Sequence, residues 1–450
     1  VSGECGSPRA SPDLISTALV LSLVLVGIAI LMRVASGTWL HPAALFPGWW
    51  CLAGIIPLIA APAEPVSPGA MLWVIVASIV VSAGAIAGNG GTATHRLRHP
   101  LDISKFEQQL LGWPMVVALV LGMLSNITFA LASGVTLADM MDIQRLVVVS
   151  NQLYVARYAE IGAPPPPRLS QALLPFVYLA PAIGGMVFVA SRKWSWKLLA
   201  LLTMLPAIAV TVLQTTKAAV LFSATLWISS YFAVRLRRGM IKVFTKGHLI
   251  IAGVLGAVAT VFFFAVGLAR MASTDTSLAA LVKVKLVTAA FGHMSVFSQW
   301  LSEYWGQGFT PTLGTYTFAG PLEMLGFRQR IPGIFENVVE MLAGETSNIY
   351  TGFRPLIQDF TMPGALAILA ILGLVAGISY REVCRGNWGA VPVLAAAYMT
   401  MLWTPITWFW IYNSLTATVV AIGLIVFFIR FWRRARLVPH TRERIVSTTW

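Results

Sequence analysis

Charged residues are scarce in this 450-residue sequence. Only 11% of the residues are Asp, Glu, Lys or Arg, whereas 57% are hydrophobic, and soluble domains carry about 25% charged residues. A soluble fold of this composition would leave much apolar surface in contact with water, so the soluble classes are excluded. The 16 Trp and 23 Phe point the same way, because aromatic rings gather at membrane interfaces. The composition predicts an all-α polytopic membrane protein.

Cysteine and histidine are scarce as well. Cys5, Cys51 and Cys384 have no paired spacing, which argues against a disulfide framework and against a zinc site. The six His are dispersed and no DxD pair occurs, so we expect no metal and no other cofactor. The sequence contains no P-loop and no GxGxxG motif. The N-terminal stretch VSGECGSPRASPDLIS lacks the basic segment of a signal peptide, so we expect no cleaved leader.

Apolar stretches of about 20 residues, the length that crosses the hydrocarbon core of a bilayer, recur along the chain. They predict about eleven transmembrane helices within a single integral membrane domain, residues 1–450. The predicted spans are Leu14–Met32, Pro42–Ala61, Gly69–Gly88, Trp113–Ser133, Ala172–Ser191, Leu198–Gln214, Ala218–Val234, His248–Leu268, Pro363–Tyr380, Gly389–Trp408 and Ile411–Ile429.

The charges are distributed unevenly over the two sides of this topology. One side collects RVASGTW, HRLRHP, SRKWSWK, RLRRGMIKVFTK, REVCR and RFWRRAR, and it holds 20 of the 31 Lys and Arg but 4 of the 17 Asp and Glu. The opposite side holds the remaining 11 basic and 13 acidic residues. This asymmetry follows the positive-inside rule and makes the first side cytoplasmic. The net charge of +14 therefore reports topology, and we expect no nucleic-acid partner.

Two external connections are longer than the others. Residues 134–170 contain Pro164–Pro167, which favour a stiff polyproline II strut. Residues 269–362 are too rich in aromatic residues and Leu to be disordered, and we expect interfacial helices there, among them Leu278–Leu301. Chemistry or recognition is expected on this large external surface. Nucleotide sugars do not reach that side, so a transferred group would arrive on a lipid carrier.

The basic residues of the outer side run against the charge bias. Each one either binds an anion such as diphosphate, or snorkels to lipid headgroups and pairs with a nearby acid. Those that follow the first predicted span are Arg145, Arg157, Arg168, Lys217, Arg270, Lys283, Lys285, Arg328, Arg330 and Arg354.

Arg354 and Asp359 are the strongest individual candidates. Phe353–Arg354–Pro355 predicts an extended turn, because the residue before a proline is biased away from the helical region. Pro363 can then begin a membrane helix. Arg354 would be held where the chain re-enters the bilayer, with Asp359 about one turn further on if the segment is helical. The two residues form either a simple ion pair or a phosphate-binding cation beside an orienting carboxylate.

A general base toward a sugar hydroxyl would come from the same long loop. The candidates are Asp275, Glu303, Glu323, Glu336, Glu340, Glu345 and His293. For each carboxylate taken singly, a solvated loop charge is the commoner role. The run SQWLSEYWGQGF at 298–309 suits stacking on sugar faces, and it suits an interfacial aromatic belt equally well.

One segment resembles a known family. TSNIYTGFRPLIQDFTMPGALAI resembles the signature of Wzy-type oligosaccharide repeat-unit polymerases (O-antigen polymerases), in which an NxYTxFRxxxxDFGxxG-like run precedes a late membrane helix. LHPAALFPGWW, QTTKAAVLFSATLWISSY, GHMSVFSQWL and YTFAGPLEMLGF are supporting similarities. The sequence departs from the pattern at Thr361–Met362, where the family usually has a glycine after Asp-Phe.

The resemblance implies a GT-C-like fold and a metal-independent glycosyltransferase of the bacterial inner membrane, with its active site facing the periplasm. Such enzymes transfer a glycan from undecaprenyl diphosphate to another lipid-linked repeat unit. Expected partners are undecaprenyl-diphosphate-linked oligosaccharides, membrane lipids and a chain-length regulator protein.

The resemblance also implies roles for individual residues. Arg354 would hold the donor diphosphate, and Asp359 would orient Arg354 or the acceptor. His293 and Glu345 are the catalytic candidates for proton transfer. The remaining substrate-binding candidates are Arg270, Arg328 and Arg330 as secondary diphosphate contacts, Arg145, Arg157 and Arg168 for the second lipid substrate, Lys217 in support, and Asn348 and Tyr350 within the motif.

Two alternatives to a polymerase stay open at this point. An O-antigen ligase has a similar layout but transfers the glycan to a lipid A-core acceptor. A lipid-linked oligosaccharide flippase or other transporter usually places ionisable residues near the bilayer midplane. The predicted spans here are nearly free of charge, which counts against transport.

Overall fold

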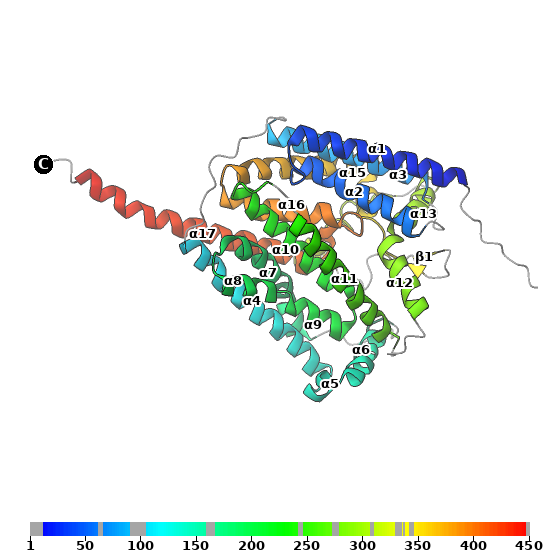
Figure 1. Ribbon diagram of the computed structural model, residues 1–450, viewed down its shortest axis with the longest axis horizontal. Helices are drawn as coiled ribbons and strands as arrows, with labels where there is room; N and C mark the ends of the chain where they lie inside the picture. Colours follow the sequence, from blue (N-terminus) through cyan, green and yellow to red (C-terminus); the bar gives the residue numbers. More distant parts are fainter. Residues whose placement is uncertain are drawn as a thin grey trace, which may run out of the picture.

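Long helices lying side by side make up most of the computed structural model of this protein (Figure 1). The structure describes residues 12–61, 66–90, 105–158, 167–241, 246–271, 279–306, 310–328, 335, 338–341 and 346–446. The helices of the bundle are α1 (Pro12–Ser36), α2 (Pro42–Ala60), α3 (Pro68–Asn89), α4 (Lys105–Ala132), α7 (Arg168–Ala190), α8 (Trp194–Leu202), α9 (Leu205–Gln214), α10 (Lys217–Arg237), α11 (Lys246–Ala269), α15 (Phe353–Cys384), α16 (Val391–Trp403) and α17 (Asn413–Val446).

Short elements connect these helices. They are α5 (Leu137–Met141), α6 (Ile143–Tyr158), α12 (Ala279–Phe291), α13 (His293–Gly306), α14 (Ala319–Met324), the 3-10 helices η2 (Trp388–Ala390) and η3 (Phe409–Ile411), and the strands β1 (Val339–Glu340) and β2 (Thr346–Ser347). The two strands pair antiparallel, with Val339 opposite Ser347.

Nine of the eleven predicted spans are helices long and apolar enough to cross a membrane within the described residues. The protein is therefore a polytopic, all-helical membrane protein. The other two predicted spans coincide with shorter apolar helices, Gly256–Ala269 and Trp388–Trp403. Within the predicted interfacial segment Leu278–Leu301 the structure has two helices, α12 and α13, bent by 58°, which would add a tenth span if the pair crossed together.

Local sequence accounts for where several helices begin and end. The His41 side chain accepts a hydrogen bond from the Ala43 backbone N–H, and Pro42 follows at the first helical position of α2. Ser67 and Pro68 begin α3 in the same way. This order is favourable because the cap satisfies a free N–H while proline has none to satisfy. Helix α3 ends at Gly90, whose φ of 79° is easy for glycine.

Helices α3 and α15 pack with their backbones almost in contact. A Cβ at Gly84 or Gly88 of α3 would lie 2.4 or 2.2 Å from a carbonyl oxygen of α15. A Cβ at Gly373 or Gly377 of α15 would lie 2.2 or 2.1 Å from a carbonyl oxygen of α3. Small residues four positions apart are how helices approach closely within a membrane. This contact fixes α15, the helix that carries the strongest candidate residues.

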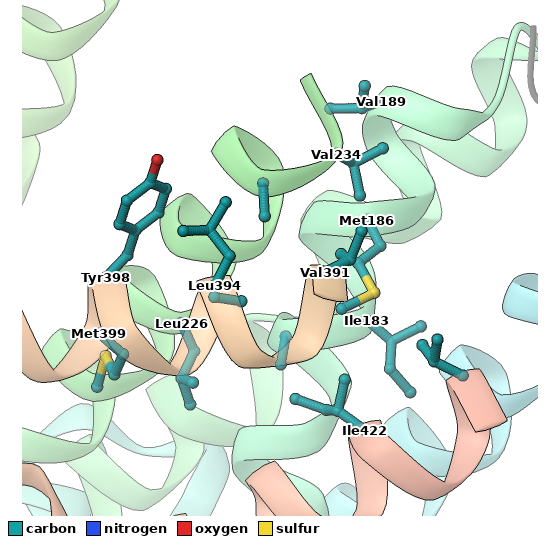
Figure 2. Close-up of a cluster of buried hydrophobic side chains, with 14 of the residues drawn as sticks. Ile183, Met186, Val189, Leu226, Val234, Val391, Leu394, Tyr398, Met399 and Ile422 are labelled. Atoms are coloured by element: carbon teal, nitrogen blue, oxygen red, sulfur yellow. The ribbon is translucent and has the colours of Figure 1, made fainter. Parts of the chain in front are cut away.

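One large apolar core lies between α7, α10, α16 and α17. Figure 2 shows its side chains meeting from all four helices: Ile183 and Met186 from α7, Leu226 from α10, Leu394 from α16 and Ile422 from α17. A second core joins α1, α2 and α3 to α13, α15 and the segment before α15. The two cores hold α15 between the N-terminal helices and the rest of the bundle.

Contacts between distant segments define one end of the bundle, which we call the basic end. Thr38 donates a hydrogen bond to the Ile241 carbonyl (3.1 Å). Arg237 donates to the Gly386 carbonyl (3.1 Å), and Arg238 donates to that of Val189 (2.7 Å). The charge pattern predicts that all these segments lie on the basic side, and in the structure they lie together at one end of the bundle.

The opposite end, which we call the Arg354 end, is joined in the same way. The Ser67 N–H donates to the Ser298 hydroxyl (2.7 Å), and the Gly352 N–H donates to the Thr404 carbonyl (2.6 Å). Figure 1 shows α12, α13 and the β1 region at this end, while the C-terminal part of α17 projects from the other. The short elements of residues 279–352 thus cover one end of the bundle.

Candidate functional site

The site is built on the first turns of α15. The predicted extended turn at Arg354 is wrong, because α15 begins ten residues before Pro363, at Phe353. Pro355 is compatible with this start, since a proline in the first turn of a helix gives up no intrahelical hydrogen bond. Phe353 anchors the turn by stacking on Trp50 of α2 at 4.8 Å. Arg354 is therefore on a helix rather than on a loop.

Helix α15 breaks at Thr361, eight residues after it begins. Thr361 has φ 60° and ψ 177°, which no helix contains. The break separates a short half-helix, residues 353–360, from the long apolar part that follows. The half-helix, and with it each of its side chains, is therefore held in place by the segments that pack around it.

Arg354 lies in a cage of aromatic rings. Its Cζ atom is 3.7 Å from the ring centre of Tyr350, 3.9 Å from that of Phe335 and 5.5 Å from that of Trp300. The side chain is only 4% exposed. Burial raises the pKa of Tyr350, against the opposing effect of the Arg354 charge, so this phenol stays neutral. Cation–π contact stabilises the guanidinium where water cannot.

The rings leave part of the guanidinium unsatisfied. Nε and Nη1 of Arg354 are buried and have no hydrogen-bond partner among the described residues. A buried charged donor without an acceptor is costly, because the hydrogen bond to water is lost and nothing replaces it. Free N–H donors of a buried guanidinium match the acceptor oxygens of a phosphate or carboxylate. The cage therefore has the chemistry of an anion site.

A second predicted arginine is connected to this cage. The Cζ atom of Arg328 lies 5.2 Å from the ring centre of Tyr316, and its Nη1 donates to the Thr315 carbonyl. The Tyr316 ring stacks on Phe335 at 5.5 Å, and Phe335 faces Arg354. Two stacked rings thus separate Arg328 from Arg354, and the structure brings both arginines to one cluster.

Asp359 is buried on a different side of the half-helix. Arg354 and Asp359 are five residues apart, which is about 140° around an ideal helix. The described ion pairs do not include one between them. The Asp359 carboxylate instead accepts from the Tyr316 N–H (3.1 Å), the Thr317 N–H (2.5 Å) and the Thr312 hydroxyl. Of the two alternatives drawn from the sequence, the simple ion pair is wrong.

The segment Thr312–Thr317 also caps the backbone of the half-helix. The Leu313 N–H donates to the Asp359 carbonyl (3.1 Å), and the Thr317 hydroxyl donates to the Pro355 carbonyl (3.2 Å). The Asp359 carbonyl has no intrahelical partner, because the helix breaks at Thr361 and Pro363, four residues on, has no N–H. Asp359 therefore holds the half-helix to the segment that also contributes Tyr316 to the ring cluster.

Lys217 and Arg270 form a second positive cluster at the same end. The Arg270 Nε donates to the Thr215 carbonyl (2.8 Å), and its Cζ lies 4.9 Å from the ring centre of Tyr154. Lys217 is close enough for the two positive charges to repel each other. Neither has a carboxylate partner among the described residues. Asn151 fixes the Arg270 backbone by donating to its carbonyl (2.7 Å).

The structure does not bring the other predicted residues into either cluster. Arg145 is exposed and lies 3.6 Å from Asp142 on the surface of α6. Arg168 is exposed at the start of α7, and Asn348 is exposed after β2. His293 is buried against α2, with Nε2 3.2 Å from the Ala53 carbonyl. Their proposed roles, including proton transfer by His293, stay predictions.

Three predicted residues lie outside the described part of the chain or have undescribed side chains. Arg330 and Glu345 lie outside the described residues, and the backbone of Arg157 is described within α6 without its side chain. The tetraproline segment is described only at Pro167, where α7 begins.

The sequence singled out Tyr350 but not the other residues that surround Arg354. Trp300 belongs to the run proposed for sugar stacking or a membrane belt, and it instead faces a guanidinium. Phe335 and Thr312 carried no signal, because nothing in their spacing points to Arg354 or Asp359. The interleaved aromatic run around Trp300 and the stretch YTFAGPLEMLGF, which begins at Tyr316, were the patterns that could have marked this neighbourhood.

Comparison of the chain with known protein families, curated proteins and solved structures finds no match. Among the described residues, no three His, Cys, Asp or Glu side chains lie close enough together to hold a metal ion. The function is therefore argued from the two positive clusters and their surroundings.

Proposed function

We propose that this protein is a periplasmic glycosyltransferase that polymerises undecaprenyl-diphosphate-linked oligosaccharides into O-antigen or a similar surface polysaccharide. The observation that carries the proposal is the buried guanidinium of Arg354, whose Nε and Nη1 have no partner among the described residues. The resemblance of residues 346–368 to the Wzy-type signature supports the same reaction.

Arg354 binds the diphosphate of the donor lipid in this proposal. Its two free N–H groups pair with phosphate oxygens and stabilise the negative charge that develops as the bond to the sugar breaks. The surrounding rings exclude water, which strengthens the interaction. Arg328 lies behind Tyr316 in the same ring cluster and adds positive potential. Diphosphate is the leaving group of this reaction. Stabilising the negative charge on it therefore favours cleavage of its bond to the sugar.

The Lys217–Arg270 cluster supplies a second anion site at the same end of the bundle. Two adjacent positive charges without a carboxylate are stabilised by a bound anion. A polymerase holds two lipid diphosphates, and the spatial separation of the two clusters agrees with two substrates. In this proposal the basic end faces the cytoplasm, as the positive-inside rule requires.

The test is reconstitution of purified protein in liposomes with a lipid-linked repeat unit. The wild-type protein is expected to produce a ladder of lengthening products, which a ligase or a flippase would not. Arg354→Ala is expected to lower the rate at least ~100-fold, as removal of one charge-stabilising donor does. Arg354→Lys is expected to fail as well, because an ammonium does not reproduce the fork of donors.

Arg385→Ala is the matched control. Arg385 is an exposed arginine at the basic end, 2.9 Å from Glu382, and its loss is expected to leave the ladder unchanged. All variants are compared at equal amounts of folded protein, judged by size-exclusion chromatography. A fully active Arg354→Ala protein would refute the role of Arg354, and a wild-type protein that makes no ladder would refute the polymerase.

A further inference from the structure

Glu303 is a carboxylate at the rim of the Arg354 cage that forms no hydrogen bond or ion pair with a described residue. It lies on α13 three residues after Trp300, so both side chains share one face of that helix, and the Trp300 ring is 5.5 Å from Arg354 Cζ. Tyr304, the next residue, packs on the same Trp300 ring at 5.5 Å. Glu303 itself is exposed.

The Glu303 carboxylate interacts electrostatically with both Arg354 and Tyr350. The distance to Arg354 exceeds that of an ion pair, and Nε and Nη1 of Arg354 stay without an acceptor. Glu303 is therefore not committed to Arg354 as a structural counter-ion. It is close to the proposed diphosphate site and free to contact a second molecule.

Two other described candidates of this region are committed elsewhere. Asp359 accepts three hydrogen bonds from Thr312–Thr317, and His293 is buried against α2. A general base has to reach the hydroxyl that it deprotonates. Glu303 is exposed and lies close to the proposed diphosphate site.

We propose that Glu303 is the general base that activates the acceptor sugar hydroxyl, an inference that rests on the proposed function. The hydroxyl oxygen forms a bond to the anomeric carbon of the donor while the bond between that carbon and the diphosphate oxygen breaks. The diphosphate leaves with the electron pair and is stabilised by Arg354. Glu303 accepts the hydroxyl proton and later releases it to water.

The experiment compares wild-type protein, Glu303→Gln and Glu303→Asp in the liposome assay, together with binding of undecaprenyl diphosphate to the purified proteins. Glu303→Gln is expected to lose at least ~100-fold in polymerisation rate, the usual contribution of a general base, and to bind undecaprenyl diphosphate as tightly as the wild type. Glu303→Asp is expected to retain part of the rate, with a changed pH profile.

Asp142→Asn is the matched control, because Asp142 is an exposed carboxylate at the same end and asparagine preserves its role as a helix cap. Its rate is expected to stay unchanged. An active Glu303→Gln protein would overturn the role of Glu303 alone. Loss of diphosphate binding in Glu303→Gln would overturn it too, since Glu303 would then position Arg354. A wild-type protein without polymerase activity overturns the proposed function and, with it, this inference.

Discussion

Thr361 has a backbone conformation that glycine adopts far more easily. Its φ of 60° and ψ of 177° lie in a region that is almost closed to residues with a branched Cβ. The contacts of Thr312–Thr317 with the half-helix hold it there. This is also the position where the sequence departs from the signature that it resembles, by having Thr in place of glycine.

Thr361→Gly is expected to stabilise the protein. Relief of strain at this position is worth about 1–3 kcal/mol, and the greater freedom of glycine in the unfolded chain offsets about 0.5–1 kcal/mol of it. The melting temperature in detergent is therefore expected to rise by a few degrees. Thr361→Ala keeps the Cβ in the same conformation and is the control without a gain. A lower melting temperature for Thr361→Gly would show that the hydroxyl or methyl of Thr361 contributes more than the strain costs.

At the scale of elements, α15 depends on its contact with α3. Four glycines, two on each helix, let the two backbones meet. In lipid there is little hydrophobic gain from bringing two apolar helices together, so close packing decides which helices associate. The position of α15 in turn sets the height of the half-helix and of Arg354.

Gly373→Ala is expected to destabilise this packing. Its new Cβ would lie 2.2 Å from the Val81 carbonyl oxygen, so α15 would have to move away from α3 to relieve the clash. Overpacking of this kind costs about 1–3 kcal/mol, so a lower melting temperature in detergent and reduced activity are expected. Gly423→Ala on α17 is the control, because a Cβ there meets nothing within 4 Å and alanine favours the helix. Equal melting temperatures for the two variants would contradict the close α3–α15 contact.

At the scale of the whole molecule, the two ends differ in charge and in architecture. In the described part of the chain, turns between helices lie at the basic end, and the Arg354 end carries α12, α13, α14 and the paired strands β1 and β2. Both proposals require the Arg354 end to face the periplasm, where lipid-linked sugars are assembled into polymers. The charge bias predicts this orientation from the energetics of insertion.

Thr310→Cys and Arg385→Cys test the orientation in intact cells. Both positions are exposed, one at each end of the bundle, and both variants are made without the native cysteines. A maleimide that does not cross the inner membrane is expected to label Thr310→Cys in cells with a permeable outer membrane. Arg385→Cys is expected to react only after the inner membrane is opened. The reverse pattern would invert the topology and exclude a periplasmic site.

The membrane class and nine of the eleven spans predicted from the sequence are confirmed, because each depends on the composition of a single stretch of chain. It missed the start of α15, since the bias of Arg354 against helix before Pro355 is weaker than the tertiary contacts of Phe353 with α2. It also missed the break in the pair α12–α13. Helix boundaries of this kind are decided by packing and not by local preference.

The candidate site was likewise predictable only in part. Arg354, Arg328, Lys217 and Arg270 could be selected from the sequence, because basic residues on the outer side of a membrane protein oppose a strong bias. Which of them lie together could not be predicted. The Asp359 carboxylate meets Thr312 across 47 residues of chain, and Arg354 meets Trp300 across a similar separation.

The sequence by itself determined that this chain lies in a membrane, where nine of its long apolar helices run and which segments are basic. The free energy of transferring a segment into lipid is a sum of contributions from its own residues, so these properties can be predicted from short stretches of sequence. Only the tertiary structure decided that Arg354 is enclosed by rings, that Asp359 holds the half-helix rather than the arginine, and that Glu303 lies at the rim. Those arrangements come from contacts between segments far apart in the chain, which no local sum contains.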